Sequence, residues 1–427
     1  MLLAIATIPS SGVFHLPSGT VEVDEELRIP ANAHDLEITG DRTTLRASNT
    51  FHGRALLSCN GCRRLTVRNI AFDGNRDGLA KPLPLPPSDR TFALFFPNNG
   101  ILLENCDGVS TDHLDFRAIA GFAILAAASK HVEIAHAIVS DSGSRNDKNR
   151  NNTTGGILFE EGAEDFAVSD STFRNIIGNA LWTHSRYGSP RNARGRFINN
   201  RFATIGRDAI QIGHASQVQV TGNVGNHIGY PAETIDVEGG GTPVAIDTAG
   251  NVDQTTYENN QFEEINGKCF DLDGFHDGAL RGNKCVNRGK PEEYAFGHFG
   301  IVFNNSNIDM QSKNITVEKN AMDGMKFGGI FVIGTGHKIR NNRLSHLNTA
   351  HCNENKALFG CAVLDEPDIL QSGIYLGSHA DRPAAARDNI IEGNTITGWK
   401  MSTRCIAAAP AVKLSDNKIA NNKCSDE

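Results

Sequence analysis

The chain has 427 residues, of which 43 are glycine and only 7 % are aromatic, and its formal net charge is −8. The acidic balance argues against a general nucleic-acid or anionic-membrane binder, and the sequence contains no apolar run of 18 residues that could span a membrane. Many glycines and few aromatics favour numerous short strands and tight turns over a few large helices.

The first 35 residues are expected to cap the N-terminal end of a repetitive fold, because an open end would leave an unpaired sheet edge. The segment Met1–Pro9 lacks a basic stretch and its apolar run is short, so we interpret it as mature protein rather than a signal peptide. Nine cysteines nevertheless favour a secreted or periplasmic protein.

Six of the cysteines lie close enough in the chain to form short-range disulfides, although the sequence leaves their connectivity open. The candidate pairs are Cys269 with Cys285, Cys352 with Cys361, and Cys405 with Cys424. The segment Cys59-Asn60-Gly61-Cys62 has no second pair and no nearby histidine, so buried or disulfide-bonded thiols are expected there rather than zinc.

A short pattern recurs along the chain: an apolar residue, two residues, asparagine, one residue and a second residue that is usually apolar. The asparagines are Asn200, Asn223, Asn260, Asn283, Asn320, Asn342, Asn394 and Asn417, separated by 23, 37, 23, 37, 22, 52 and 23 residues. The base period is therefore 22–23 residues, with insertions in some coils. The leucine consensus of a leucine-rich repeat is absent, whereas three short strands per period fit, with asparagine amides bonding from coil to coil at one corner.

A second pattern opens each coil with apolar residues at alternate positions, as in Asp208-Ala209-Ile210-Gln211-Ile212 and Gly300-Ile301-Val302-Phe303. Alternation with period two places one set of side chains in the core and the other set outside. These patterns predict an all-β parallel β-helix of about 12 coils that forms one domain over residues 36–427.

The insertions all follow the asparagine strand and precede the opening strand. They comprise residues 74–99, 141–155, 225–243, 287–299 and 346–372. Loops that leave from one corner are expected to build a wall beside the opening strands, and a wall on a rigid sheet makes a groove. Five neutral insertions are the alternative.

The outward positions of the opening strands are polar in the middle of the chain and apolar towards the C-terminus. Asp271 and Asp273 are predicted to share the outer face, with Asp247 one coil away. Carboxyl groups this close raise one another's pKa and supply a protonated acid beside an ionised base, as in glycosidases. His276 completes the candidate catalytic set. An Asp-rich turn or a calcium site are the alternatives; no other cofactor is expected.

Further residues near this face are candidates for binding the substrate. Trp182 could stack on a sugar ring or serve as a structural core residue. Arg186 could hold a carboxylate or sulfate of the substrate. The full predicted set is Glu160, Trp182, His184, Arg186, Tyr187, Gln211 and His214.

The coil period, the asparagines and the Gly-Ile openings make roughly residues 36–424 resemble the pectate-lyase-like superfamily of right-handed parallel β-helices. The resemblance implies a right-handed coil and a groove along this sheet, where many members cleave or epimerise polysaccharides. The Asn-Thr-Asp, Asp-Asp, Gly-His-Gly and Arg-Ile-Lys motifs of polygalacturonases are absent, and Gly213-His214-Ala215 departs from Gly-His-Gly. No polygalacturonase residue can therefore be carried over.

Three functions follow as hypotheses, each with a poly- or oligosaccharide as the partner. The first is a glycoside hydrolase that uses two of Asp247, Asp271 and Asp273. The second is a uronate lyase or epimerase with Arg186, His184 or Tyr187 as base and calcium on the carboxylates. The third is a non-catalytic surface or adhesive solenoid, because fold alone decides no reaction.

Overall fold

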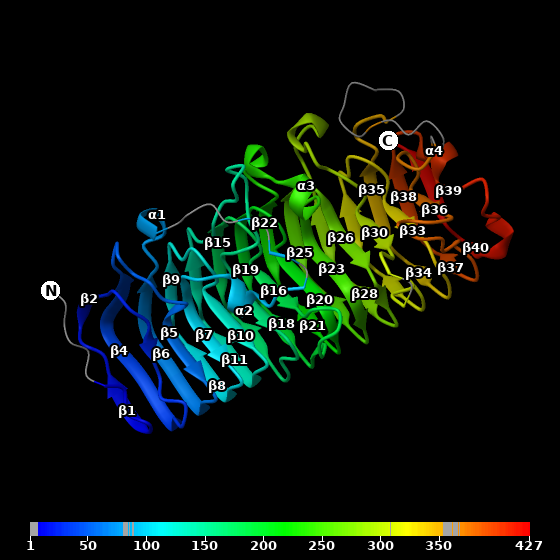
Figure 1. Ribbon diagram of the computed structural model, residues 1–427. Coiled ribbons are helices and arrows are strands. Elements are labelled where there is room, and N and C mark those ends of the chain that lie inside the picture. Colours follow the sequence, from blue (N-terminus) through cyan, green and yellow to red (C-terminus); the bar gives the residue numbers. More distant parts are fainter. Residues whose placement is uncertain are drawn as a thin grey trace. The chain divides into compact units, whose positions relative to one another are not determined.

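The computed structural model describes residues 7–79, 84, 86–87, 89–307, 309–352, 361, 366 and 368–427. Short parallel strands joined by tight bends dominate it, and the helices are short (Figure 1). The chain divides into two compact units. Unit 1 comprises residues 1–207 and 233–241, and unit 2 comprises residues 208–232 and 242–427.

In unit 1 the strands that open successive coils pair in parallel. They are β3 (Leu27–Arg28), β5 (Ala55–Asn60), β7 (Asn99–Glu104), β10 (Ile124–Ala127), β13 (Ile157–Glu160) and β16 (Leu181–His184). The helices of unit 1 are α1 (Arg76–Leu79), α2 (Phe92–Phe95) and α3 (Val237–Gly240).

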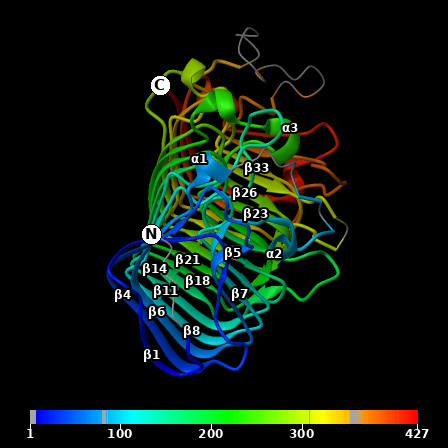
Figure 2. The ribbon, with the colours of Figure 1, turned by 60° about the vertical axis from the view of Figure 1, so that its left-hand side comes forward.

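The other walls of unit 1 are also parallel, and β4, β6, β8 and β11 lie side by side (Figure 2). These strands are β1 (Gly12–His15), β2 (Gly19–Val23), β4 (His34–Ala47), β6 (Arg63–Asp73), β8 (Asp107–Asp112), β9 (Asp115–Arg117), β11 (Lys130–Ala135), β12 (Ile138–Ser140), β14 (Ala167–Ser169), β15 (Thr172–Ile176), β17 (Asn192–Ala193), β18 (Arg196–Ile198) and β19 (Arg201–Ile205). Strands β1, β2 and β3 fall inside the predicted N-terminal cap and pair in parallel with the next coil. Regular coils therefore begin at Gly12 rather than at residue 36.

The opening strands of unit 2 continue the same pattern. They are β20 (Ile210–Ser216), β23 (Val244–Asp253), β26 (Lys268–Asp273), β30 (Ile301–Asn304), β33 (Ile330–Val332), β36 (Ile374–Leu376) and β39 (Ile406–Ala408). Their inward residues stack in register and are 0 % exposed: Ile210, Ile246, Phe270, Ile301, Ile330 and Ile374. This ladder is the apolar core that the alternation predicted, and its burial is the main stabilising contribution.

The remaining strands of unit 2 form the other walls of its coils. They are β21 (Gln219–Thr221), β22 (Val224–Ile228), β24 (Thr256–Glu258), β25 (Gln261–Ile265), β27 (Phe275–His276), β28 (Ala279–Arg281), β29 (Lys284–Val286), β31 (Thr316–Glu318), β32 (Ala321–Asp323), β34 (Lys338–Arg340), β35 (Arg343–Leu347), β37 (Ile390–Glu392), β38 (Thr395–Gly398), β40 (Lys418–Ala420) and β41 (Lys423–Asp426). Helix α4 spans Met401–Arg404.

The asparagine ladder is present in unit 2. Each Oδ1 accepts the backbone N–H and the side-chain Nδ2 of the asparagine in the preceding coil, from Asn223 through Asn260, Asn283, Asn320, Asn342 and Asn394 to Asn422. The last member is Asn422, not Asn417 as the spacing predicted. Asn417 belongs to a second ladder with Asn389.

The three predicted disulfides are present, and Cys59 and Cys62 form a fourth. The insertions at 74–99, 141–155 and 287–299 connect the last strand of one coil to the opening strand of the next, as predicted, whereas those at 225–243 and 346–372 begin inside β22 and β35. The described residues include no helix with the length and apolar character needed to cross a membrane.

Candidate active site

Three polar side chains lie next to one another on the outer face of unit 2. Gln211 of β20 is in register with Asp247 of β23, and Asp247 is in register with Asp271 of β26. Asp271 is followed in the same row by Val302, Phe331 and Tyr375. The predicted change from polar to apolar outward positions is therefore confirmed, and Asp247 lies one coil from Asp271.

The three side chains form a connected polar cluster. Gln211 Nε2 donates a hydrogen bond of 2.7 Å to Asp247 Oδ2, and Lys268 Nζ forms an ion pair with Asp271 Oδ2. Asp247 and Asp271 are only 9 % and 8 % exposed. Within the described part of the chain, the buried Asp271 Oδ1 has no hydrogen-bond partner. An unsatisfied carboxylate oxygen at such a position costs stability and is typical of a functional site.

Burial and neighbouring charges shift the pKa values of Asp247 and Lys268. Burial, followed by the charges of Asp208 and Asp271, raises the pKa of Asp247 well above its ordinary value. Burial acts to lower the pKa of Lys268, but Asp271 outweighs it, so the pKa is raised and the ammonium stays charged. Asp247, whose pKa is raised, therefore stands beside Asp271, which Lys268 pairs with, and carboxyl groups in such different surroundings are what acid–base catalysis needs.

This raised pKa predicts how stability depends on pH. The folded state holds the Asp247 proton more tightly than the unfolded state, so the contribution is fully present below the ordinary pKa of 3.8 and is lost as pH rises through the folded pKa. We expect Asp247→Asn to have a higher Tm than wild type at pH 7 and nearly the same Tm at pH 4. Thermal unfolding at the two pH values measures the difference. An equal or lower Tm of the variant at pH 7 would contradict the raised pKa.

Asp273 is on the same face as Asp271 and is more exposed. Its Oδ1 accepts a hydrogen bond of 2.8 Å from the backbone N–H of Ser306. Burial raises the pKa of Asp273, while the Ser306 N–H opposes this by stabilising the ionised form. Asp273 is therefore the carboxyl group of the cluster with the best access to solvent.

Two predicted site residues lie apart from the carboxyl cluster. His276 is in β27, beyond the bend at Gly274, and its ring contacts Asp277 Oδ2 at 2.7 Å and Asn251 Oδ1 at 3.1 Å. His214 is at the irregular bend of β20 and is 9 % exposed. Each histidine follows a bend or irregularity in its strand and lies outside the row of Asp247 and Asp271, and the role predicted for it stays a prediction.

Sequence reasoning missed Lys268 and His298. Burial, and to a smaller extent the charge of Lys268, lower the pKa of His298 to about 3, so its imidazole is neutral. The Nδ1 atom of His298 is buried and has no hydrogen-bond partner among the described residues. The sequence offers one signal for Lys268, because it is the first residue of the strand that carries Asp271. In the structure Lys268 is in register with Val244, at the start of the strand that carries Asp247.

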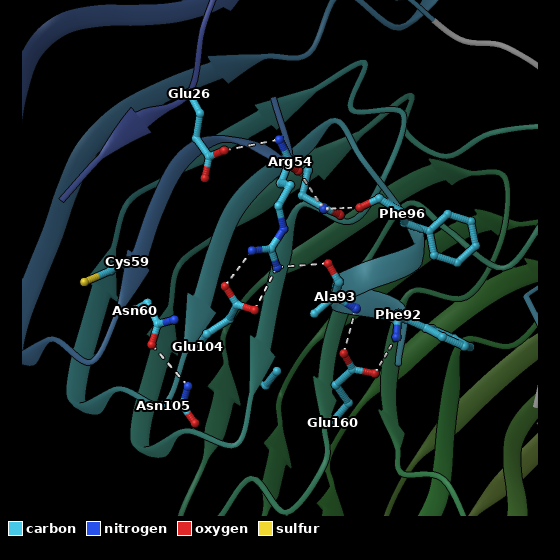
Figure 3. A network of polar contacts seen from close by, with 12 residues as sticks. Glu26, Arg54, Cys59, Asn60, Phe92, Ala93, Phe96, Glu104, Asn105 and Glu160 are labelled. Carbon is cyan, nitrogen blue, oxygen red and sulfur yellow. Dashed lines mark hydrogen bonds and ion pairs between the residues drawn. The ribbon is translucent and has the colours of Figure 1, made fainter. Parts of the chain in front are cut away.

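Three of the predicted substrate residues of unit 1, Glu160, Trp182 and His184, are covered by residues 89–98, which we call the strap. Glu160 is 0 % exposed, and its carboxylate accepts the backbone N–H groups of Phe92 (2.9 Å) and Ala93 (2.7 Å) at the start of α2. Arg54, paired with Glu104 at 2.7 Å, donates to the carbonyl oxygen of Ala93 at 3.0 Å (Figure 3). The strap is thus held at Phe92 and Ala93 through backbone N–H groups and through a backbone carbonyl group.

The strap also buries the aromatic residues that were expected to face a sugar. Phe92 stacks on His184 with ring centroids 4.4 Å apart and meets the Trp182 ring at 4.9 Å. Trp182 is only 7 % exposed and packs with Leu125 and Leu158. The outer face of the opening strands is apolar around Trp182, so the strap packs on this face. The sequence had predicted that the loops would form a wall beside it. Glu160, Trp182 and His184 therefore serve packing in this structure, and the alternative of a structural Trp182 holds.

We expect Glu160→Gln to loosen the strap. A Gln amide offers one acceptor where the carboxylate accepts two N–H groups, and leaving one buried N–H unsatisfied costs about 1–3 kcal/mol. Trp182 fluorescence should shift to the red in this variant. Glu133→Gln changes an exposed acid of the same unit and should leave emission and stability unaltered. Equal emission spectra for the two variants would refute the clamping role of Glu160.

Arg186 and Tyr187 lie at the edge of unit 1. Arg186 is occupied by Glu161, with contacts of 3.2 Å and 3.0 Å from Nε and Nη2 to Oε2, so it is not a free clamp for a substrate carboxylate. Tyr187 is 62 % exposed. Unit 1 also has an open cleft of about 580 Å³, lined among others by Arg28, His52 and Asn98, and none of the predicted site residues lines it.

The parallel coils and their spacing define a class of protein, the right-handed parallel β-helix. Residues 155–344 match the family model described as a right handed beta helix region, which confirms the fold that the resemblance implied. No curated protein sequence matches the chain.

Solved structures of the same fold are similar to the chain at low sequence identity. They include DFA-IIIase from Arthrobacter chlorophenolicus A6 in complex with GF2 (10 % identity, 95 % of this chain, 87 % of that chain, TM-score 0.55). They also include the mannuronan C-5 epimerase AlgE6 A-module of Azotobacter vinelandii (12 %, 96 %, 91 %, 0.53) and PfbA, a surface adhesin of Streptococcus pneumoniae (15 %, 78 %, 82 %, 0.53). The chain spans 54 % of the Geobacillus virus E2 ORF18 chain. At these identities the similarity concerns the fold.

Proposed function

We propose that this chain is a carbohydrate-active enzyme that hydrolyses a glycosidic bond of a poly- or oligosaccharide on the outer face of β23 and β26. The observation that carries the proposal is the register of Asp247 with Asp271, which puts a buried carboxyl group of raised pKa beside a second carboxyl group that pairs with Lys268. The structurally similar DFA-IIIase and mannuronan C-5 epimerase support a carbohydrate-active enzyme and leave the kind of reaction open.

In the proposed reaction Asp247 is the general acid and Asp273 the general base. The Asp247 proton passes to the glycosidic oxygen as the bond from that oxygen to the anomeric carbon breaks. A water molecule forms the new bond to the anomeric carbon and gives its proton to Asp273. Asp247 and Asp273 are diagonal neighbours whose Cα positions are about 8 Å apart from the strand spacing and rise, and carboxyl groups carried on such positions can span the separation of about 6.5–9.5 Å that inverting enzymes use.

Asp271 and Gln211 act as positioning residues in this reaction. Burial, followed by the charges of Asp208 and Asp271, favours the proton on Asp247 by raising its pKa, and Lys268 holds the Asp271 side chain through their ion pair. Gln211 orients the Asp247 carboxyl group through its hydrogen bond. The uronate lyase or epimerase is less well supported, because Arg186 is paired with Glu161 and His184 is stacked under Phe92.

A panel of neutral and acidic polysaccharides that includes mannuronan tests the proposal, with and without chelator. Release of reducing ends without ultraviolet-absorbing unsaturated product, insensitive to chelator, is the expected result. An unsaturated product that disappears with chelator would replace hydrolysis by calcium-dependent elimination. Binding without any product would favour the adhesive alternative. We also propose that the protein is secreted or periplasmic. Locating it in fractions of its native cell tests this.

A further inference from the structure

A second group of polar side chains lies in unit 1, on a wall formed by β8 and β11. Asp112, His113 and His136 each offer a donor atom within 4.8 Å of the others. Nδ1 of His113 lies 2.8 Å from Asp112 Oδ2, and Nδ1 of His136 lies 2.8 Å from Asp112 Oδ1. The imidazole rings stack with centroids 4.7 Å apart.

The backbone holds this arrangement in place. Asp112 is in register with Ala135, so the bends that follow the two strands lie over one another. His113 and His136 both have left-handed backbone conformations, with φ of 50° and 51°, and such a conformation is uncommon outside glycine, asparagine, aspartate and histidine. In the next coil Ala135 pairs with Ser169, so Asp170 with φ of 50° occupies the same bend.

We propose that Asp112, His113 and His136 form a binding site for a divalent transition cation. Two imidazole nitrogens and carboxylate oxygens are a donor set that suits Zn²⁺ and disfavours Ca²⁺ or Mg²⁺, which take oxygen ligands. In a tetrahedral zinc site with bonds of about 2.0–2.1 Å, ligand atoms are about 3.3 Å apart. The 2.8 Å contacts need only a small expansion to admit the ion.

The ion would link two successive coils of unit 1. It would replace the protons that the two Nδ1 atoms share with Asp112, and it would bind only the folded chain because the ligands are aligned by the strand register. Binding to the folded state alone raises stability with ligand concentration. The side chains are 44–62 % exposed, so an ion can enter without any rearrangement of the core.

Zinc titration of the metal-stripped, tag-free full chain by calorimetry tests the site. One zinc per chain is expected, with at least about tenfold weaker binding for His113→Gln, His136→Gln and Asp112→Asn. His131→Gln is the matched control, because His131 is paired with Asp107 at 2.7 Å but has no second imidazole in its cluster among the described residues. All variants should have the Tm of wild type without metal, and zinc should raise the Tm of wild type and His131→Gln only.

Three results would overturn the proposal. Wild type could fail to bind zinc, or the His113, His136 and Asp112 variants could bind it as tightly as wild type. Zinc binding that is lost in His184→Gln and kept in His136→Gln would assign the ion to the group of Glu160, Glu161 and His184 instead. Circular dichroism and the Tm of metal-free His136→Gln separate the loss of a zinc ligand, which leaves both unchanged, from a loss of the fold, which alters both.

Discussion

Asp247→Asn is expected to lower kcat on a natural polysaccharide by about 10²–10⁴-fold, because it removes the proton that the leaving oxygen needs. Asparagine keeps the size of the side chain and an oxygen that can accept the hydrogen bond of 2.7 Å from Gln211. The substitution therefore removes the transferable proton of residue 247 and keeps its hydrogen bond to Gln211. Initial rates on the best substrate of the panel measure the effect.

The leaving group distinguishes the acid from the base. With an activated aryl glycoside, whose leaving group needs no proton, Asp247→Asn should regain most of its activity, whereas Asp273→Asn should stay impaired. Asp323→Asn, a change to a surface aspartate of unit 2 that pairs with His346, serves as the control and should behave as wild type. Full activity of both Asp247→Asn and Asp273→Asn on the natural substrate would remove these residues from the mechanism.

Asn283→Ala is expected to destabilise unit 2 by about 4 kcal/mol. Asn283 Oδ1 accepts the N–H of Asn260 at 3.0 Å, and Asn283 Nδ2 donates to the carbonyl of Tyr257 at 2.8 Å. Alanine leaves two or three buried polar groups without a partner, at about 1–3 kcal/mol for each group. Denaturant unfolding measures the loss, and hydrogen exchange at the neighbouring coils locates it.

Asn226→Ala is the control for the ladder. Asn226 is in β22 of the same unit, its side chain is exposed, and it is outside the ladder. A surface change of this kind costs less than about 0.5 kcal/mol. If Asn283→Ala were no more destabilising than Asn226→Ala, the ladder would not be a source of stability in this fold.

The fold could be predicted because every coil makes the same corner hydrogen bond and buries the same face of its strands. The spacing of Asn260, Asn283 and Asn320 reports one corner hydrogen bond made again in every coil, and alternation at Ile210 and Ile212 separates core from surface. The same logic put Asp247 one coil from Asp271. Asn417 was assigned to the wrong ladder because its local pattern is the same in both, and only strand register distinguishes them.

The coverage of the outer face could not be predicted in the same way. Alternation says that Trp182 points away from the core, but it does not say which loop then lies on it. Phe92 reaches Glu160 across 68 residues of chain, and such a contact depends on the shape of the whole strap. The position of His276 could not be predicted for a related reason, because the bend at Gly274, with φ of 73°, ends the alternation between Asp273 and His276.

The central claim is tested most directly by a crystal structure of the Asp247→Asn variant with an oligosaccharide of its best substrate. We expect the glycosidic oxygen within hydrogen-bonding distance of residue 247 and a water molecule between the anomeric carbon and Asp273. A sugar bound only at the cleft of Arg28 and His52, or none within reach of β23 and β26, would contradict the assignment of the reaction to this face.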